Sequence, residues 1–441
     1  PIRSTDAYYQ VYRIAREHMP QVLEGRESFA RFLPWAREIL RFIELLDLED
    51  IGSDVLQNIE SAASIGYDVP ESINALLKHV ILLRERYHEM LASGGMISRG
   101  LEYRLAARDI GRTAFDEFEV ILFMDLFFMH RTEQTVLKTL FDRGQAVLMF
   151  QGDEKDWTVL RDNARVFGHP IWPERKHTRE PSVSFHRGFD THSQVGIVRE
   201  LLKDLDSPDD TAVVLPDTSS LVPLLSQISP VVEDCNVSMG YPMRRSSLYV
   251  LFSTIFQAQS TRRDGTYYVR DYLSVLHHPL IKNLRMLEDA AVTRVLIHSI
   301  EEVLAGQEQS AVSGELFVRL IDIEQSPEIA YRTRQTLSGM GLTAESGQLR
   351  RMMTYIHMIA FGEWEVCHSF RDFTAALGRF LDLLVERSPL EKYPLNLKIA
   401  DRLFALRDEL DSAVFAAEAF ARRELFNVFM RLLENEQVAF A

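Results

Sequence analysis

Two aspartates lie in or at the end of short apolar runs, where a parallel sheet would position them for metal chemistry. Asp125 lies within VILFMDLFFM, residues 120–129, and Asp153 closes QAVLMFQGD, residues 145–153. Carboxylates at the carboxyl ends of parallel strands can hold Mg²⁺ beside a bound nucleotide. The competing interpretation is that both aspartates have only a structural role at the edge of a sheet.

The other groups that nucleotide hydrolysis requires are missing from the sequence. No G-x-x-x-x-G-K-[ST] phosphate loop occurs in the 441 residues. Leu126 follows Asp125, at the position where a carboxylate would be needed to orient the attacking water. Because leucine can neither accept a proton nor orient water, we assign no catalytic residue and expect no ATP hydrolysis.

Residues 236–285 form a basic segment within an acidic chain. The segment holds seven Arg or Lys against two Asp, whereas the whole chain has a formal net charge of −15. Cations bind phosphate and aromatic rings stack on unpaired bases, and this segment interleaves its cations with Tyr241, Tyr267, Tyr268 and Tyr272. The competing interpretation is a solvated surface with tyrosines in the core. The predicted DNA-binding residues are Arg244, Arg245, Arg262, Arg263, Arg270 and Lys282, together with Arg187 from the polar stretch before them.

The two apolar runs and the polar stretch between them predict a strand, a helix and a strand. Residues 131–143 have the composition of a helix, and the spacing is that of a βαβ unit with parallel strands. Such a unit would bring Asp125 and Asp153 to one edge of the sheet. We expect residues 120–129 to be a buried strand, because the run is too short to span a bilayer and carries Asp125.

A second α/β pattern follows a polar, basic linker at residues 173–192. Residues 195–205 and 221–228 are predicted to be helical, TAVVLPD at residues 211–217 a buried strand, and NVSMGYP at residues 236–242 a short strand. This order predicts a second parallel sheet.

Helical periodicity dominates both ends of the chain. Apolar residues recur at spacings of three and four in residues 29–46 and 71–91, and Gly94-Gly95 predicts the end of the second helix. Residues 286–441 are again helical in pattern, and residues 401–437 are long and periodic. These blocks predict accessory helical domains, or packed bundles without a site of their own.

The stretch ILFMDLFFMHRTEQTVLKTLFDRGQAVLMFQGDEKDW resembles the motif II to motif III region of superfamily-one helicases of the UvrD type, which carry D-E-x-Q-D and then G-D-x-x-Q. Leu126, Phe128 and Asp156 replace the motif Glu and both Gln residues. The positions that resemble relics of a nucleotide site are Asp125, Leu126, Gly152, Asp153 and Asp156. This decay resembles the AddB/RexB group, the inactivated helicase-like subunits of bacterial helicase–nucleases, and residues 211–283 are similar to the start of their second helicase domain.

The resemblance implies a predominantly helical α/β chain with two partial RecA-like parallel-sheet domains and large all-helical insertions. The implied parts are a helical insertion at 1–105, the rest of the first RecA-like domain at 106–172, the start of the second at 173–285, and a second helical insertion at 286–441. It also implies a DNA-repair scaffold that binds single-stranded DNA or a duplex end, with an AddA-like helicase–nuclease subunit as partner. No cofactor is expected in this chain, and ATP and Mg²⁺ would belong to the parent protein or its partner.

Two alternatives stay open: a fragment of an active ATP-dependent helicase or exonuclease, and a helical protein-interaction module without a nucleic-acid role. We find no Asp…Glu-x-Lys nuclease pattern, so a PD-(D/E)xK domain would lie outside this chain. The sequence begins with Pro1 rather than Met, which predicts an internal fragment of a larger protein.

The composition, 46% hydrophobic and 26% charged, is that of a globular protein. The net charge argues against a protein that coats nucleic acid with a uniformly basic surface. Two distant cysteines, Cys235 and Cys367, exclude a cysteine-based metal site and fit a reducing cytoplasm. No run is suited to a signal peptide or a membrane span, so we expect a cytoplasmic protein without a membrane partner.

Overall fold

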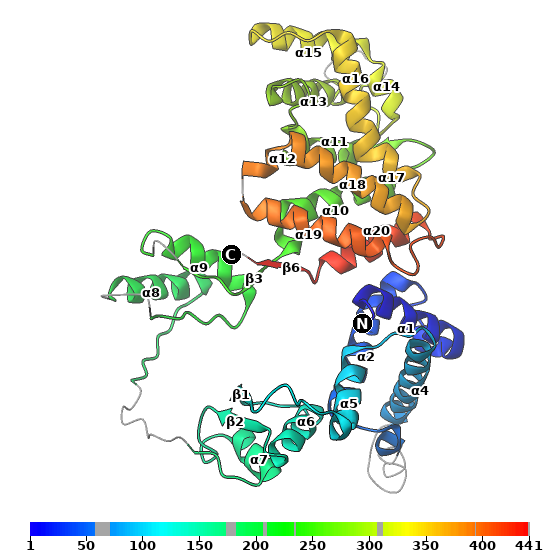
Figure 1. Cartoon of the computed structure of the whole chain (residues 1–441). Helices are drawn as coiled ribbons and strands as arrows, with labels where there is room; N and C mark the ends of the chain where they lie inside the picture. The colour runs from blue at the N-terminus through cyan, green and yellow to red at the C-terminus, as the bar shows by residue number, and fades with distance from the viewer. Residues whose placement is uncertain are drawn as a thin grey trace. The chain divides into compact units, whose positions relative to one another are not determined.

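The computed structural model describes residues 1–57, 71–172, 182–205, 210–232, 235–306, 312–392 and 394–439. The chain forms two compact units, Pro1–Val183 and Ser184–Ala441 (Figure 1). Helices make up most of both units, and the sheets between described residues are small, with two strands each. The prediction of a predominantly helical α/β chain is therefore confirmed at this coarse level.

The first unit opens with the helices α1 (Ser4–His18), α2 (Phe29–Leu48), α4 (Glu71–Ser93) and α5 (Arg99–Asp109). The predicted helices at residues 29–46 and 71–91 are confirmed, and Gly95 adopts a positive φ of 61° just after the end of α4. Ser28 and Ser98 cap α2 and α5 by accepting hydrogen bonds from backbone amides in the first turn of each helix.

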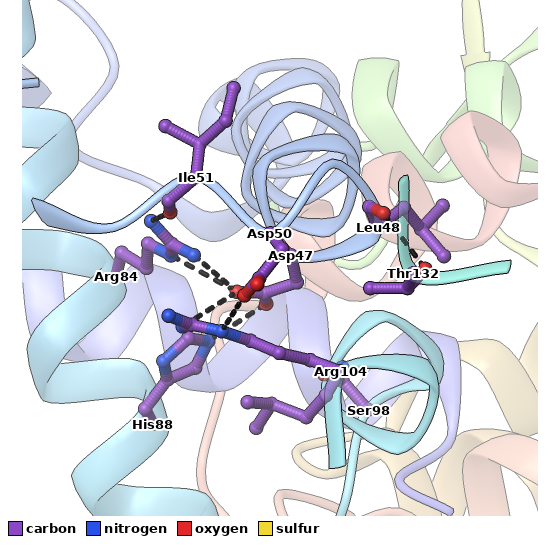
Figure 2. Close-up of polar contacts among 10 residues, drawn as sticks. Asp47, Leu48, Asp50, Ile51, Arg84, His88, Ser98, Arg104 and Thr132 are labelled. Carbon is purple, nitrogen blue, oxygen red and sulfur yellow. Dashed lines mark hydrogen bonds and ion pairs between the residues drawn. The ribbon is translucent and has the colours of Figure 1, made fainter. Parts of the chain in front are cut away.

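A buried ionic network joins these helices near the end of α2 (Figure 2). Arg84 on α4 donates to the fully buried Asp47 carboxylate, with Nε 3.1 Å from Oδ1, and His88 Nε2 lies 3.0 Å from Oδ2. Burial alone would raise the pKa of Asp47, but the hydrogen bond and charge of His88 and those of Arg84 lower it overall. Asp47 is therefore a carboxylate that fixes α2 against α4.

The first unit then forms the predicted βαβ arrangement. Strands β1 (Ile121–Leu126) and β2 (Ala146–Phe150) pair in parallel and are connected by α6 (Arg131–Asp142), and α7 (Thr158–Phe167) follows. Side chains of α6 and α7 pack on one sheet face, where Leu137 and Phe167 share a core cluster with Phe123. The strand–helix–strand prediction is confirmed.

The opposite face of this sheet is bare within the described part of the chain. Leu122 and Met124 are 60% and 63% exposed, and Val147 and Met149 on β2 are also exposed. The prediction that residues 120–129 form a buried strand is therefore wrong in two respects: β1 spans Ile121–Leu126 only, and of the whole run Met129 alone is buried. Side chains alternate between the two faces of a strand, and α6 and α7 cover one face only.

The second unit opens with α8 (Thr191–Lys203) and α9 (Leu221–Ile228), which confirm the predicted helices. Residues 211–217 are not a strand, and Val214 is 86% exposed. A strand needs a hydrogen-bonded neighbour, and none of the described segments pairs with this one. The predicted strand at 236–242 shrinks to β3 (Gly240–Pro242), which pairs antiparallel with β6 (Gln437–Ala439). The predicted second parallel sheet therefore does not form among the described residues.

The rest of the second unit is a helical bundle around α10 (Ser247–Thr261). Its Phe252 and Phe256 contact aromatic rings of later helices, and Phe256 stacks on Phe426 with ring centroids 4.2 Å apart. The other helices are α11 (Val269–His277), α12 (Pro279–Lys282), α13 (Ala290–Leu304), α14 (Leu320–Glu324), α15 (Pro327–Gly339), α16 (Ser346–His357), α17 (Glu363–Glu365), α18 (Phe370–Arg387), α19 (Pro394–Asp411) and α20 (Arg422–Leu433).

The helical character predicted for residues 286–441 is confirmed, although residues 401–437 form two helices, α19 and α20, with a break between them. The expected boundary between residues 285 and 286 lies within the bundle, since α10 packs on α20. A short antiparallel pair, β4 (Tyr267–Tyr268) with β5 (Phe317–Val318), closes one side. No helix in the described ranges is both long and apolar enough to cross a membrane.

Candidate nucleic-acid interface

A groove runs along α10 and α11 in the second unit. It consists of two adjoining hollows of about 590 Å³ and 770 Å³, which share Val250, Thr254, Tyr268, Arg270 and Ser274. Its α10 wall follows from helical spacing, because Val250, Ser253, Thr254, Gln257 and Thr261 lie on one helix face. The apolar residues between them, such as Phe252 and Ile255, are buried in the bundle.

Two arginines lie in the smaller hollow, which we call the arginine groove. Arg244 precedes α10 and Arg270 stands in the first turn of α11, and both side chains are exposed. Among the described residues neither guanidinium forms a hydrogen bond or an ion pair. Asp271 is the acidic residue of this lining, and its carboxylate accepts a hydrogen bond from Thr261 Oγ1 at 2.6 Å. The arginine groove therefore presents two available cations against one carboxylate.

Two tyrosines supply aromatic surface to the same groove. Tyr249 and Tyr268 are both half-buried, and the Tyr268 ring lies 5.5 Å from that of Phe317. Burial, assisted by Glu434, raises the pKa of Tyr249, so its hydroxyl stays protonated at neutral pH. A partly exposed aromatic ring beside two cations can pack against a nucleobase while the cations contact phosphate.

The other predicted tyrosines have different roles. Tyr267 and Tyr272 are fully buried, and both rings pack against Phe361. Tyr272 also shares a 2.8 Å hydrogen bond with His357, whose other ring nitrogen lies 2.8 Å from Glu324. Tyr241 donates to the backbone oxygen of Arg245. For Tyr267 and Tyr272, the alternative of tyrosines packed into the core is therefore confirmed.

The structure separates the remaining predicted cations from the arginine groove. Arg262 is engaged by Glu365 in an ion pair of 2.6 Å and lies over the Tyr267 ring. Arg245 donates to the backbone oxygen of Ser219, and Lys282 is half-buried on α12.

Arg263 is exposed and lies 5.5 Å from the centre of the Phe317 ring, which also contacts Tyr268. Arg263 thus stands near the groove, whereas Arg262 is held within the fold.

Arg187 lies in the extended, exposed stretch at residues 182–188, and the structure gives it no neighbour from the arginine groove. The larger hollow differs in charge because Glu301 and Glu315 line it together with Arg270 and His277. The polar residues Ser253, Gln257 and Thr261 were not predicted as part of a site. Their common helix face was the available signal, once α10 was recognised as a helix.

The expected relics of a nucleotide site lie in the first unit, at the end of β1 and in the turn after β2. Asp125 adopts a positive φ of 58° where the pairing of β1 with β2 shifts register, which is unusual for a residue other than glycine. Asp153 Oδ1 accepts a hydrogen bond from the Lys155 amide at 2.9 Å, so this carboxylate closes a turn. Gly152 has a φ of 126°, and a Cβ there would come within 2.7 Å of Leu160. Asp156 is exposed in the same turn.

The hollow beside Asp125 and Leu126 has the wrong charge for a polyphosphate. Its volume is about 500 Å³, and its acidic lining consists of Glu102, Asp125 and Glu133, with no Lys or Arg lining it among the described residues. Phosphate sites in nucleotide-binding folds instead offer lysine or backbone amides at a helix start. In the part of the chain that the structure describes, no group of His, Cys, Asp and Glu could hold a metal ion.

No protein-family model matches the chain, and no curated protein matches it significantly in sequence. The arginine groove is therefore interpreted from its own chemistry. Two unpaired guanidinium groups, a polar helix face and two half-buried tyrosines can bind an anionic, aromatic polymer.

Proposed function

We propose that this chain is a non-hydrolytic, helicase-like scaffold that binds DNA and works with a motor or nuclease partner in DNA repair. The observation that carries the proposal is the arginine groove, where Arg244 and Arg270 stand free beside Tyr249 and Tyr268. Two of the predicted DNA-binding cations are thus found together with aromatic surface. The resemblance to the AddB/RexB group supports the same role, and a cytoplasmic location would suit it.

The absence of hydrolysis is supported by the residues around Asp125. Leu126 occupies the position of the water-orienting carboxylate, and Glu102, Asp125 and Glu133 make the adjoining hollow acidic. An acidic hollow repels a nucleoside triphosphate, so this chain contributes binding rather than turnover. ATP and Mg²⁺ would then act on the partner.

The groove favours unpaired over paired DNA. Stacking on Tyr249 or Tyr268 requires a base whose face is free, which single strands and frayed duplex ends offer. The two guanidinium groups would contact phosphates without reading sequence. We therefore expect affinity for single-stranded DNA with little sequence preference.

Fluorescence anisotropy with a labelled 20-nucleotide oligothymidylate at several salt concentrations tests the proposal. Replacing Arg244 and Arg270 together by alanine should weaken binding and make the plot of log K against log salt shallower by about 1.4, since each lost phosphate contact on a single strand accounts for about 0.7. The matched control replaces Arg294 and Arg319, two exposed arginines outside both hollows, and should leave the slope unchanged.

Three results would contradict the proposal. The first is the absence of oligothymidylate binding at low salt. The second is an equal loss in the Arg294/Arg319 control, because binding would then reflect overall charge. The third is DNA-stimulated ATP turnover by the chain that Asp125→Ala abolishes, which would favour the active-helicase alternative.

A further inference from the structure

The acidic hollow beside Asp125 is a formed pocket with an apolar interior. It lies between α5, the end of β1 and α6, and its volume is about 500 Å³. Its apolar lining consists of Ala106, Phe123, Leu126, Phe127, Phe128, Met129, Val136 and Leu137. Phe128 is 65% exposed, so the pocket opens onto bare aromatic surface.

The two helical walls of the pocket are fixed to the end of α2. On α5, Arg104 Nε lies 2.9 Å from Asp50 Oδ1, and on α6 the Thr132 hydroxyl donates to the Leu48 oxygen at 2.8 Å (Figure 2). His130 Nδ1, at the start of α6, lies 2.6 Å from Glu49 Oε1. Because consecutive residues of one segment hold both walls, the pocket exists before anything binds to it.

Three carboxylates line this pocket, those of Glu102, Asp125 and Glu133. The Glu133 carboxylate already has a partner within the protein, since it accepts a hydrogen bond from the His130 amide at 2.8 Å. Glu102 and Asp125 are exposed, and among the described residues neither carboxylate has a hydrogen bond or an ion pair. The pocket thus combines an apolar interior with two unpaired carboxylates and no cation in its described lining.

We propose that this pocket binds a segment of a partner protein that inserts a large apolar side chain and carries Lys or Arg beside it. The cations would pair with Glu102 and Asp125, while the apolar side chain would fill the space above Leu137 and Val136. A nucleotide or nucleic acid would be repelled by the same carboxylates. The inference does not rest on DNA binding, because the arginine groove belongs to the other unit.

The test measures binding of a fluorescein-labelled helical peptide of repeating Lys-Leu-Leu to the full chain at 50 mM salt. Two variants address the pocket: Ala106→Trp fills it, and Glu102→Gln with Asp125→Asn removes its free charges. Asparagine tolerates the positive φ at position 125. Each variant should weaken peptide binding at least tenfold. The matched control, Glu117→Gln with Glu119→Gln, removes two exposed carboxylates outside the lining and should change affinity less than twofold.

Each of three outcomes would overturn the proposal. Equal weakening in the Glu117/Glu119 control would mean that the peptide binds the acidic surface in general. Unchanged binding by both pocket variants, with native circular dichroism, would place the peptide elsewhere. Equal binding of a peptide with Glu in place of Lys would remove the charge argument. Retained oligothymidylate binding in the pocket variants would show that the DNA proposal stands separately.

Discussion

His278 is a buried histidine whose side chain caps the start of α12. Its Nδ1 accepts a hydrogen bond from the Leu280 amide at 3.3 Å, which makes the imidazole the N-cap of the helix. Burial disfavours the charged ring and lowers the pKa of His278 to about 4, against a smaller opposing effect from Ser247. The folded protein therefore keeps this imidazole neutral at pH 7.

This low pKa predicts that the second unit loses stability in mild acid. Between pH 6.5 and about 4 the unfolded chain binds a proton at His278 that the folded chain does not, so the free energy of unfolding falls as the pH falls. The loss at this site between pH 7 and pH 5 should be roughly 2 kcal/mol. His278→Asn keeps a capping oxygen but cannot titrate, so urea unfolding should show a smaller loss in this variant.

His357 is an internal control for this measurement, because burial also lowers its pKa while Glu324 opposes the shift. Its contribution persists in His278→Asn and leaves some acid sensitivity. An unchanged pH dependence in the asparagine variant would show that His278 does not stay neutral in the folded state.

Sequence reasoning at the residue scale found cations but not their partners. Arg244 and Arg262 carry the same charge in the same basic segment, yet Arg262 is neutralised by Glu365, about a hundred residues further along the chain. Local charge counts cannot detect such a contact, because it depends on how α10 and α17 pack. Leu126 was interpretable without the fold because its chemistry alone excludes a catalytic role.

At the scale of elements, the sheet of β1 and β2 predicts an asymmetry between its two faces. Replacing Leu122 and Met124 together by threonine should change the free energy of unfolding by no more than about 0.5 kcal/mol, because both side chains are exposed and threonine suits a strand. Leu140→Ala, on α6 where this side chain packs against the covered face of the sheet, should cost roughly 2–5 kcal/mol. Urea unfolding compares the two, and binding of an apolar dye should fall in the threonine variant.

A large loss of stability in the threonine variant would mean that the bare face is covered in solution. The sequence predicted the elements of this sheet correctly but not its exposure. A continuous apolar run such as residues 120–129 is consistent with burial on both faces, and the packing of α6 and α7 on one side decides otherwise. Similarly, residues 211–217 had the composition of a strand but lacked a neighbour with which to pair.

At the scale of the whole molecule, charge is distributed unevenly along the chain, and this distribution bears on the DNA-binding proposal. Residues 286–441 hold 16 basic and 24 acidic residues, whereas residues 236–285 hold seven basic and two acidic ones. In the folded second unit, Arg244 and Arg270 of the basic segment face one hollow. An acidic protein can therefore bind an anionic polymer locally, with long-range repulsion that salt screens.

The division into two units predicts where a protease cuts first. Val183 ends one unit and Ser184 begins the other, and nearby Phe185 and Phe189 are 94% and fully exposed. Because chymotrypsin needs an accessible aromatic side chain on unstructured backbone, brief digestion should cleave after Phe185 or Phe189 and give two fragments. Mass spectrometry of the early products identifies the bonds cut, and Phe185→Ser with Phe189→Ser should delay the first cut.

The two fragments also allow the two proposals to be tested independently of each other. Each unit has its own buried core, so both fragments should keep helical circular dichroism. The fragment that begins after the cut should retain oligothymidylate binding, because it carries Arg244 and Arg270. The other fragment should retain the Lys-Leu-Leu peptide, because it carries Glu102 and Asp125. A first cut elsewhere than after Phe185 or Phe189, or loss of both activities on separation, would contradict the view that each unit carries its own binding surface.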